Sequence, residues 1–282
     1  MAKLSVVKLA ESRLRNKFHV KKLRLERKFQ NIGTDNGQGF FDAYPAFFET
    51  STSGHRNRLN KRYRAIIEPN LDIIQGKSIL DIASHDGRWS LAASKAGAEH
   101  ILGIEARDHL VKHAQENLRK YGVPDGQVEF VRGDVFDVIQ TLEPGRFDTV
   151  FCLGFFYHTL YHMELLNGIA RLSPQHLILD TCIDVDPDPM VIVHFEDTTH
   201  ETAGALPDEG NGSLLLVGHP TRKALEMMLR AVGFNCRYID WHAMGIRNWE
   251  FIQEYHEGLR VTVVAENTKR QAAPGSVGAN TL

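Results

Sequence analysis

Short apolar runs alternate with stretches of helical spacing along the middle of the chain. The first run, residues 78–83, is interrupted by a single acid and predicts a buried strand, because strands covered on both faces are apolar throughout. Residues 89–96 follow with helical spacing, and Gly97 ends that helix. A second strand is expected over residues 101–104, closed by Glu105.

The same alternation of strand and helix continues to residue 265. The expected elements are strands over 128–131, 147–153, 177–179, 236–239 and 260–265, and helices over 108–121, 135–142, 163–172 and 221–232. Strands that alternate with helices favour a parallel sheet covered on both faces, with ligands at the carboxyl ends of the strands. We therefore predict an α/β fold, a doubly wound and mostly parallel seven-stranded sheet with an N-terminal helical lid.

Aromatic residues gather in a loop-like stretch, residues 31–54, ahead of this sheet. Such a stretch suits a lid or a wall of a substrate site, or equally a small satellite core. Apolar spacing over 59–74 predicts a helix that is broken or kinked at its proline. On the first interpretation, Tyr44 and Phe48 of the lid and Arg58 of the helix are candidate substrate contacts.

The predicted organisation has three parts. Residues 1–54 form a basic N-terminal arm and the aromatic lid, residues 55–266 form the sheet domain with an insert over 182–220, and residues 267–282 have the composition of a disordered tail. The insert interrupts the alternation of strands and helices. Long connections in compact domains are often functional.

Composition is that of an ordinary globular protein, with 282 residues, 43% hydrophobic and 24% charged. Three distant cysteines and the lack of a membrane-spanning run or secretion signal predict a cytoplasmic protein. Residues 1–30 hold ten Lys or Arg and two acids, a local charge of +8, so the rest carries −10 against a net −2. Such an arm could contact nucleic acid, an anionic membrane or a partner subunit, and a homo-oligomer stays open. A solvated arm is the favoured interpretation.

A turn of small residues, 84–87, joins the first strand to the first helix. Backbone N–H groups at a helix N-terminus bind polar ligand groups, and an acid at the tip of the next strand, Glu105, can accept hydrogen bonds from ribose hydroxyls. The inference is a nucleoside-containing cofactor. Of the glycines in a dinucleotide motif, G-x-G-x-x-G, only Gly87 is present. The stretch resembles the first motif, D/E-x-G-x-G-x-G, of class I S-adenosylmethionine-dependent methyltransferases, with Ala83 and His85 in place of the first two glycines.

Later features occur in the order found in that family: Glu105 after the second strand, Gly133-Asp134 after the third, and FDTVFCLGFFYH, residues 147–158, in the fourth. The resemblance covers about residues 60–265 and implies a Rossmann-like methyltransferase fold that binds S-adenosylmethionine. The residues that it implies are Asp81, Ala83, Ser84, His85 and Gly87 for methionine and ribose, Glu105 and Ala106 for ribose, Asp134 and Val135 for adenine, and Leu153 and Gly154 beside the sulfonium.

Within that superfamily, FDTVFCLGFFYHTLYHMELL is most similar to the tRNA wobble-uridine carboxymethyltransferases, whose motif reads F-D-x-V-F-x-x-G-x-L-Y-H-R. Tyr157 and His158 match, but Thr159 stands where that family has a basic residue. Basic and tyrosyl groups in that family recognise an extra carboxylate on the cofactor. We therefore expect ordinary S-adenosylmethionine here.

Methyl transfer from a sulfonium is an in-line displacement, and an alcohol nucleophile also needs a proton acceptor or a metal. His158 is the candidate base, or else a histidine that holds its loop, and Tyr157 would position substrate or cofactor, or simply pack. Asp180, just before the acidic insert, and Glu196 and Asp197 within it resemble the acids of magnesium-dependent sugar O-methyltransferases and are candidate Mg²⁺ ligands. An acidic solvated loop is the favoured interpretation of the insert.

The leading function is that of a methyltransferase acting on a hydroxyl of a small molecule such as a sugar or glycan. The alternative is a tRNA-modifying methyl- or carboxymethyltransferase acting at a uridine, although the acidic body offers no wide basic stripe for nucleic acid. A protein that binds the nucleoside cofactor without chemistry is the third interpretation.

Overall fold

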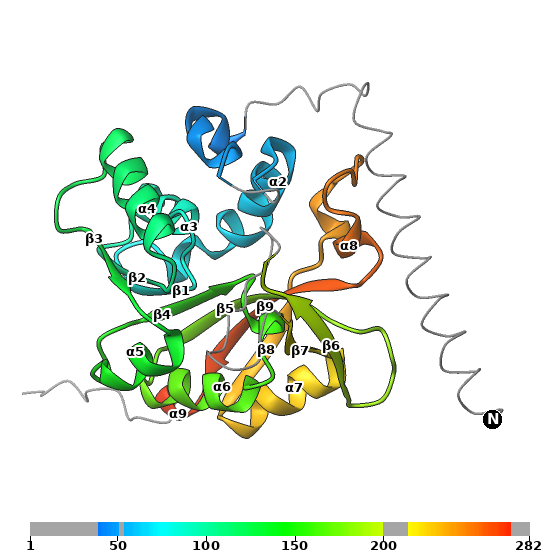
Figure 1. Cartoon of the computed structure of the whole chain (residues 1–282). Coiled ribbons are helices and arrows are strands. Elements are labelled where there is room, and N and C mark those ends of the chain that lie inside the picture. Colours follow the sequence, from blue (N-terminus) through cyan, green and yellow to red (C-terminus); the bar gives the residue numbers. More distant parts are fainter. Residues whose placement is uncertain (1–38, 51–53, 200–213, 272–282) are drawn as a thin grey trace, which may run out of the picture. The chain divides into compact units, whose positions relative to one another are not determined.

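The computed structural model describes residues 39–50, 54–199 and 214–271 (Figure 1). Its centre is a seven-stranded sheet in the order β3-β2-β1-β4-β5-β9-β8. The strands are β1 (Ser78–Ile82), β2 (His100–Glu105), β3 (Val128–Arg132), β4 (Thr149–Leu153), β5 (His176–Cys182), β8 (Phe234–Tyr238) and β9 (Arg260–Asn267). Strands β1 to β5 are parallel, and β9 is antiparallel to both β5 and β8. The predicted fold class is confirmed.

Helices cover both faces of this sheet (Figure 1). They are α2 (Arg56–Ile66), α3 (Arg88–Lys95) and α4 (Asp108–Lys120) on one face, and α5 (Val135–Thr141), α6 (His162–Arg171) and α7 (Arg222–Ala231) on the other. The side chain of Thr221 caps α7 by accepting a hydrogen bond from the N–H of Ala224.

Neighbouring strand residues supply two separate cores, because successive side chains of a strand point to opposite faces. In β1, Ile79 lies in the core shared with α2 and α3, whereas Leu80 lies in the core shared with α5, α6 and α7. Phe151 and Cys152 of β4 divide in the same way. The continuous apolar runs in the sequence are therefore the strands that face helices on both sides.

The aromatic stretch ahead of the sheet packs as part of a core. Two 3₁₀ helices, η1 (Phe40–Ala43) and η2 (Pro45–Phe48), bury Phe41 and Phe47 in the core that holds Trp89 of α3. These aromatic residues thus belong to a main core of the sheet and do not form a small satellite core. The helix predicted over 59–74 divides, because Pro69 opens a separate 3₁₀ helix, η3 (Glu68–Ile73).

Within the insert, β6 (Val191–Asp197) and β7 (Leu214–Pro220) pair as a two-stranded antiparallel ribbon, which corrects the interpretation of these residues as a loop. A further region that the sequence left unassigned holds η5 (His242–Met244) and α8 (Gln253–His256). There Trp241, Ile252 and Tyr255 pack on α2 in a third, smaller core. The pattern missed it because its apolar residues follow neither helical nor strand spacing.

The start of the tail predicted over residues 267–282 is wrong. Asn267 still pairs within β9, and α9 (Thr268–Gln271) follows it. Residues 272–282 and the basic arm over residues 1–30 lie outside the described residues. Among the residues that the structure describes, no helix is both long and apolar enough to cross a membrane.

Candidate active site

The carboxyl ends of β2, β1, β4 and β5 lie side by side, because these four strands are neighbours and parallel. The chain proceeds outward from β1 through β2 and β3 on one side, and through β4 and β5 on the other. Open α/β sheets bind ligands in the crevice where the strand order reverses in this way. The predicted residues 83–87, Glu105 and 153–158 therefore meet at one edge of the sheet.

The turn after β1 takes an unusual backbone path. Ala83, His85 and Gly87 have φ angles of 52°, 56° and 79°, in the left-handed region that glycine adopts most easily. Ala83 and His85 thus keep the backbone conformation expected of the glycines that they replace in the motif. The hydroxyl of Ser84 is buried and has no hydrogen-bond partner among the described residues.

Glu105 closes β2 with a buried carboxylate beside this turn. It accepts hydrogen bonds from the backbone N–H of His85 at 3.0 Å, from that of Arg107 at 3.1 Å and from Nε of Arg107 at 2.7 Å. Burial opposes ionisation, but the hydrogen bonds and charge of Arg107 outweigh it and lower the pKa of Glu105. An ionised acceptor therefore stands where the sequence predicted the ribose contact.

Two further acids support the turn from within. Burial raises the pKa of Asp81 to about 7, although Ser90 of α3 donates a hydrogen bond to it at 2.6 Å. Asp86 is also buried, but the Arg88 guanidinium at 2.7 Å and the contact with His85 hold its pKa well below its usual range. Asp81 secures α3 against β1, and Asp86 secures the start of that helix.

The remaining predicted cofactor residues lie along the same edge. Asp134 is the N-cap of α5 and accepts a hydrogen bond from the N–H of Phe136 at 2.8 Å, while Val135 is buried. Ala106 follows Glu105 directly. This edge of the sheet fits an adenosyl cofactor, because the protein offers there the ionised, buried carboxylate of Glu105, a hydroxyl on Ser84 without a partner among the described residues, and a left-handed turn.

A buried charge network that the sequence did not predict lies at the ends of β4 and β5. Asp180 has no exposed surface and accepts hydrogen bonds from Nη2 of Arg62 at 3.0 Å and Nε of Arg260 at 2.6 Å. Tyr255 and Thr262 donate to the same carboxylate. Burial would raise the pKa of Asp180, but Arg260 and Arg62 lower it to about 2.

Both arginines of this network also reach the end of β4. Arg62 donates to the carbonyl of Leu153 at 3.3 Å and stacks on Trp89, with 4.9 Å to the ring centre. Gly154 has a φ of 121°, and a Cβ atom there would lie 3.2 Å from Nη2 of Arg260. Positive charge thus borders the predicted sulfonium end of the cofactor site. The sequence analysis singled out Arg58 of this helix and not Arg62.

His158 ends the short 3₁₀ helix η4 (Phe156–His158) just beyond β4. Its Nδ1 is in direct contact with the carboxylate of Glu196 on β6. The ring of Tyr157 packs on His158 with 4.1 Å between ring centres, and the Tyr157 hydroxyl accepts a hydrogen bond from Nη1 of Arg260 at 3.4 Å. The structure therefore gives the candidate base a carboxylate partner from the insert.

The predicted magnesium ligands do not come together. Asp180 is saturated by its four partners, Glu196 contacts His158, and Asp197 lies exposed on the opposite face of β6, where it accepts hydrogen bonds from Thr199. Within residues 39–50, 54–199 and 214–271, no group of three or more His, Cys, Asp or Glu is arranged to hold a metal ion. The described residues thus do not fit Mg²⁺, and we derive no step through it.

The predicted substrate contacts are engaged within the protein. Tyr44 packs on Tyr121 with 5.0 Å between ring centres, and Phe48 packs against the core beside it. Arg58 pairs with Glu254 of α8 and donates to the carbonyl of Phe251 at 2.6 Å. Their role toward a substrate stays a prediction.

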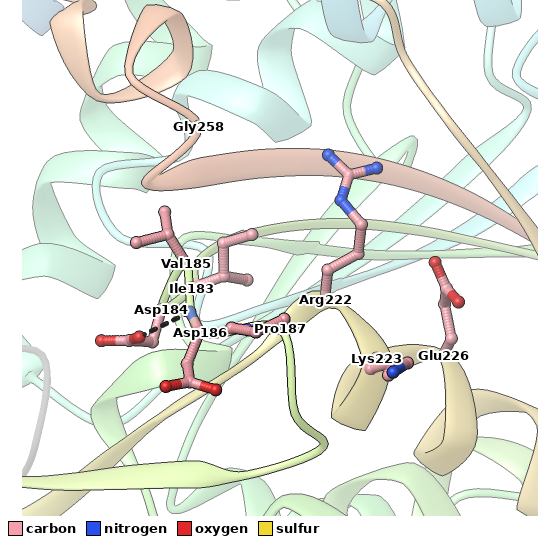
Figure 2. Close-up of a pocket in the computed structure, with 9 residues that line it drawn as sticks. All are labelled: Ile183, Asp184, Val185, Asp186, Pro187, Arg222, Lys223, Glu226 and Gly258. Carbon is pink, nitrogen blue, oxygen red and sulfur yellow. Dashed lines mark hydrogen bonds between the residues drawn. The ribbon is translucent and has the colours of Figure 1, made fainter.

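A pocket of about 310 Å³ lies beyond β5, at the start of α7 (Figure 2). Its lining residues are Ile183, Asp184, Val185, Asp186, Pro187, Arg222, Lys223, Glu226 and Gly258. Figure 2 shows Asp184 and Asp186 on one side and the α7 residues on the other, with the N–H of Asp186 bonded to Asp184 at 3.0 Å. None of the predicted site residues lines this pocket.

Part of the chain matches a known family, and curated relatives cover part of it. Residues 79–174 match the family described as methyltransferase domain. The 23S rRNA (uracil(1939)-C(5))-methyltransferase RlmD of Neisseria lactamica is 39% identical over 172 residues, 52% of this chain and 36% of that protein. The tRNA U34 carboxymethyltransferase of Aliivibrio salmonicida is 29% identical over 170 residues, 59% of this chain and 47% of that protein. The chain thus spans less than half the length of either relative.

Two solved structures share the fold. The N-terminal domain of EvdMO1 with SAH bound is 19% identical, with a TM-score of 0.53 over 90% of this chain and 97% of that one. An S-adenosylmethionine-dependent methyltransferase from Mesorhizobium loti is 16% identical, with a TM-score of 0.50 over 71% of this chain and 96% of that one. Residues 79–174, from β1 to just beyond α6, therefore match the methyltransferase domain family, within a sheet that has the fold of these structures.

Proposed function

We propose that this protein transfers a methyl group from S-adenosylmethionine to a hydroxyl of a small-molecule acceptor such as a sugar or glycan. The observation that carries the proposal is the position of His158, in contact with Glu196 at the end of β4, on the same edge as Glu105 and the turn after β1. A base and a nucleoside site on one edge are what methylation of a hydroxyl requires.

Each part of the edge has a role in this proposal. Glu105 would accept hydrogen bonds from the ribose of the cofactor, and Arg62, which donates to the carbonyl of Leu153 at the same edge, would hold the cofactor carboxylate. When bound, S-adenosylmethionine supplies a methyl group on a sulfonium, and the electrons of its C–S bond stay on sulfur as the new C–O bond forms. His158 takes the hydroxyl proton at Nε2, while its Nδ1 faces Glu196.

The charge of the protein and its fold bear on the class of methyl acceptor. The acidic charge outside residues 1–30 favours an uncharged or cationic small molecule over a polyanion. A crystal structure of the N-terminal domain of EvdMO1 was determined in the presence of SAH and D-fucose. The likeness to that domain is one of fold, and it makes sugars the first acceptors to test.

A second candidate is carboxymethyl or methyl transfer to a tRNA uridine. Arg260 lies against Tyr157, with 5.2 Å from the guanidinium carbon to the ring centre, so a basic and a tyrosyl group do meet at the end of β4. These are the groups expected to recognise an extra cofactor carboxylate. The tRNA U34 carboxymethyltransferase relative supports the same candidate.

Calorimetry and a transfer assay test both candidates. We expect binding of S-adenosylmethionine, and transfer of its labelled methyl group to sugars rather than to tRNA. His158→Ala should lower kcat by about 10²–10⁴-fold, because general-base catalysis contributes that much, and should leave cofactor affinity unchanged. Tighter binding of carboxy-S-adenosylmethionine together with modification of tRNA would favour the second candidate. Absence of binding to either donor would overturn the proposal.

A further inference from the structure

We propose that Glu196 is a positioning residue, whose carboxylate accepts a hydrogen bond from the Nδ1–H of His158 and so leaves the Nε2 lone pair of that imidazole free. The inference rests on the proposed function only for the source of the proton that Nε2 takes up, the hydroxyl of the acceptor. It assigns a role to the insert, which has no counterpart in the alternation of strands and helices around it.

The ribbon of β6 and β7 brings this carboxylate to His158. Successive residues of β6 alternate between the two faces of the ribbon, so that Phe195 is 72% exposed while the side chain of Glu196 is only 16% exposed. The side chain of His158 is 11% exposed where the two meet. Two largely buried groups in direct contact form a stronger pair than groups on an open surface.

The register of the ribbon selects this acid over its neighbour. Glu196 pairs with Leu215 across the ribbon, whereas Asp197 pairs with Leu214 and is exposed. A shift of one residue would turn Glu196 outward, because the side chains of a strand have a period of two. Asp197 therefore offers a matched control: an adjacent carboxylate on the same strand that faces away from the imidazole.

Other titratable groups face His158 from the elements around it. Tyr157 packs on it from η4, and His219 of β7 packs on Tyr157 with 5.7 Å between ring centres. Burial and the nearby charges of His194 and His158 lower the pKa of His219 to about 4, so His219 is neutral at pH 7. Glu196 is thus the group in this set that brings a negative charge into contact with the imidazole.

The contact determines which nitrogen of His158 can act as a base. A neutral imidazole carries one proton, and the hydrogen bond made by one nitrogen decides which of the two carries it. A carboxylate against Nδ1 keeps the proton there, so Nε2 is the acceptor. Once Nε2 has taken a proton from a hydroxyl, the carboxylate also offsets the positive charge of the imidazolium, as in other carboxylate–histidine pairs.

The proposal is tested in the free protein, without cofactor. Nitrogen NMR of histidine-labelled protein reports the tautomer, and the His158 signals are assigned by their loss in His158→Gln. We expect Nδ1–H in the wild type and in Asp197→Asn. We expect a gain of Nε2–H in Glu196→Ala, whereas Glu196→Gln keeps an acceptor oxygen and should largely restore Nδ1–H. Unchanged unfolding midpoints show that the variants fold.

Kinetics give the second measurement. In Glu196→Ala, kcat should fall by roughly tenfold or more but by less than in His158→Ala, with the Kd for S-adenosylmethionine unchanged, because base catalysis is impaired and not removed. The same His158 tautomer in the wild type and in Glu196→Ala would overturn the proposal. The expected tautomers without methyl transfer to any acceptor would support the pairing and contradict the proposed function.

Discussion

The carboxylate of Asp180 lies 2.6 Å from Nε of Arg260, and neither residue has more than a few per cent of its surface exposed. The two residues are 80 positions apart in the sequence and meet because β5 and β9 are antiparallel neighbours, with Cys182 opposite Arg260. Arg62 completes the network from α2. The pair thus ties the last strand and the first described α-helix to the edge of the sheet where the candidate site lies.

Asp180→Asn should destabilise the protein strongly. Removing one member of a buried ion pair leaves the other charge uncompensated, which costs about 3–5 kcal/mol, and here two guanidinium groups lose their partner. Urea unfolding followed by circular dichroism measures the change. Asp186→Asn, at an exposed carboxylate, is the control and should change stability by less than about 0.5 kcal/mol. Equal stabilities of the two variants would contradict the assigned role of Asp180.

Asp81 should make stability fall as pH rises. Its pKa is raised to about 7 in the folded protein and is about 3.9 in an unfolded chain, so the folded state holds its proton more tightly between these values. Asp81→Asn should therefore gain stability over the wild type from about pH 4 to pH 7, by about 2–4 kcal/mol in all. Denaturant unfolding at a series of pH values measures the difference.

Asp86 should give the opposite pH dependence of stability in the same experiment. Its folded pKa is held well below the ordinary value, so its contribution is present at neutral pH and is lost as pH falls below about 4. Asp86→Asn should accordingly be most harmful at pH 7. If the stability of both variants relative to the wild type changed with pH in the same direction, the assignment of a raised pKa to Asp81 and a lowered pKa to Asp86 would be wrong.

Ala83→Gly should leave stability unchanged or raise it by up to about 1 kcal/mol. A left-handed conformation costs a residue with a Cβ atom about 1–2 kcal/mol, and the greater conformational freedom of glycine in the unfolded chain offsets part of the gain. Ala93→Gly, within α3, is the control and should cost about 1 kcal/mol or more. Thermal unfolding of both variants tests the turn geometry. A loss of stability in Ala83→Gly as large as that in the control would refute it.

Glu105→Gln should weaken the binding of S-adenosylmethionine by roughly 10- to 100-fold, because hydrogen bonds to a charged group contribute about 1.5–3 kcal/mol. Titration calorimetry measures the change. Glu129→Gln removes the same charge from the adjacent strand β3 at an exposed position and should leave affinity unaltered. If the two variants bind alike, Glu105 does not contact the ribose.

Local pattern was enough to predict most of the fold. The strand, turn, helix and strand from residue 78 to Glu105 occur where the apolar runs and Gly97 indicate, and α7 lies within the helix predicted over 221–232. These features depend on interactions between residues that are close in sequence, so the spacing of side chains reveals them. The same holds for the arrival of the turn and Glu105 at one edge, which follows from parallel neighbouring strands.

Contacts between distant segments could not be predicted in this way. Asp180 was interpreted as a metal ligand because its sequence neighbourhood is acidic, whereas its partners Arg62 and Arg260 are 118 and 80 residues away. The burial of Phe41 and Phe47 likewise depends on Trp89, in a helix beyond the first strand.

By itself, then, the sequence determined the alternation of strands and helices in the main sheet, the presence of a turn after β1 and the position of His158 at the end of β4. Only the tertiary structure decided which charges meet there: Arg260 reaches the site through strand pairing, and Glu196 reaches His158 through the register of the ribbon. The physical reason is that the spacing of side chains reports interactions within a few residues of sequence. The partner of a buried charge depends instead on which strands and helices the packed cores place side by side.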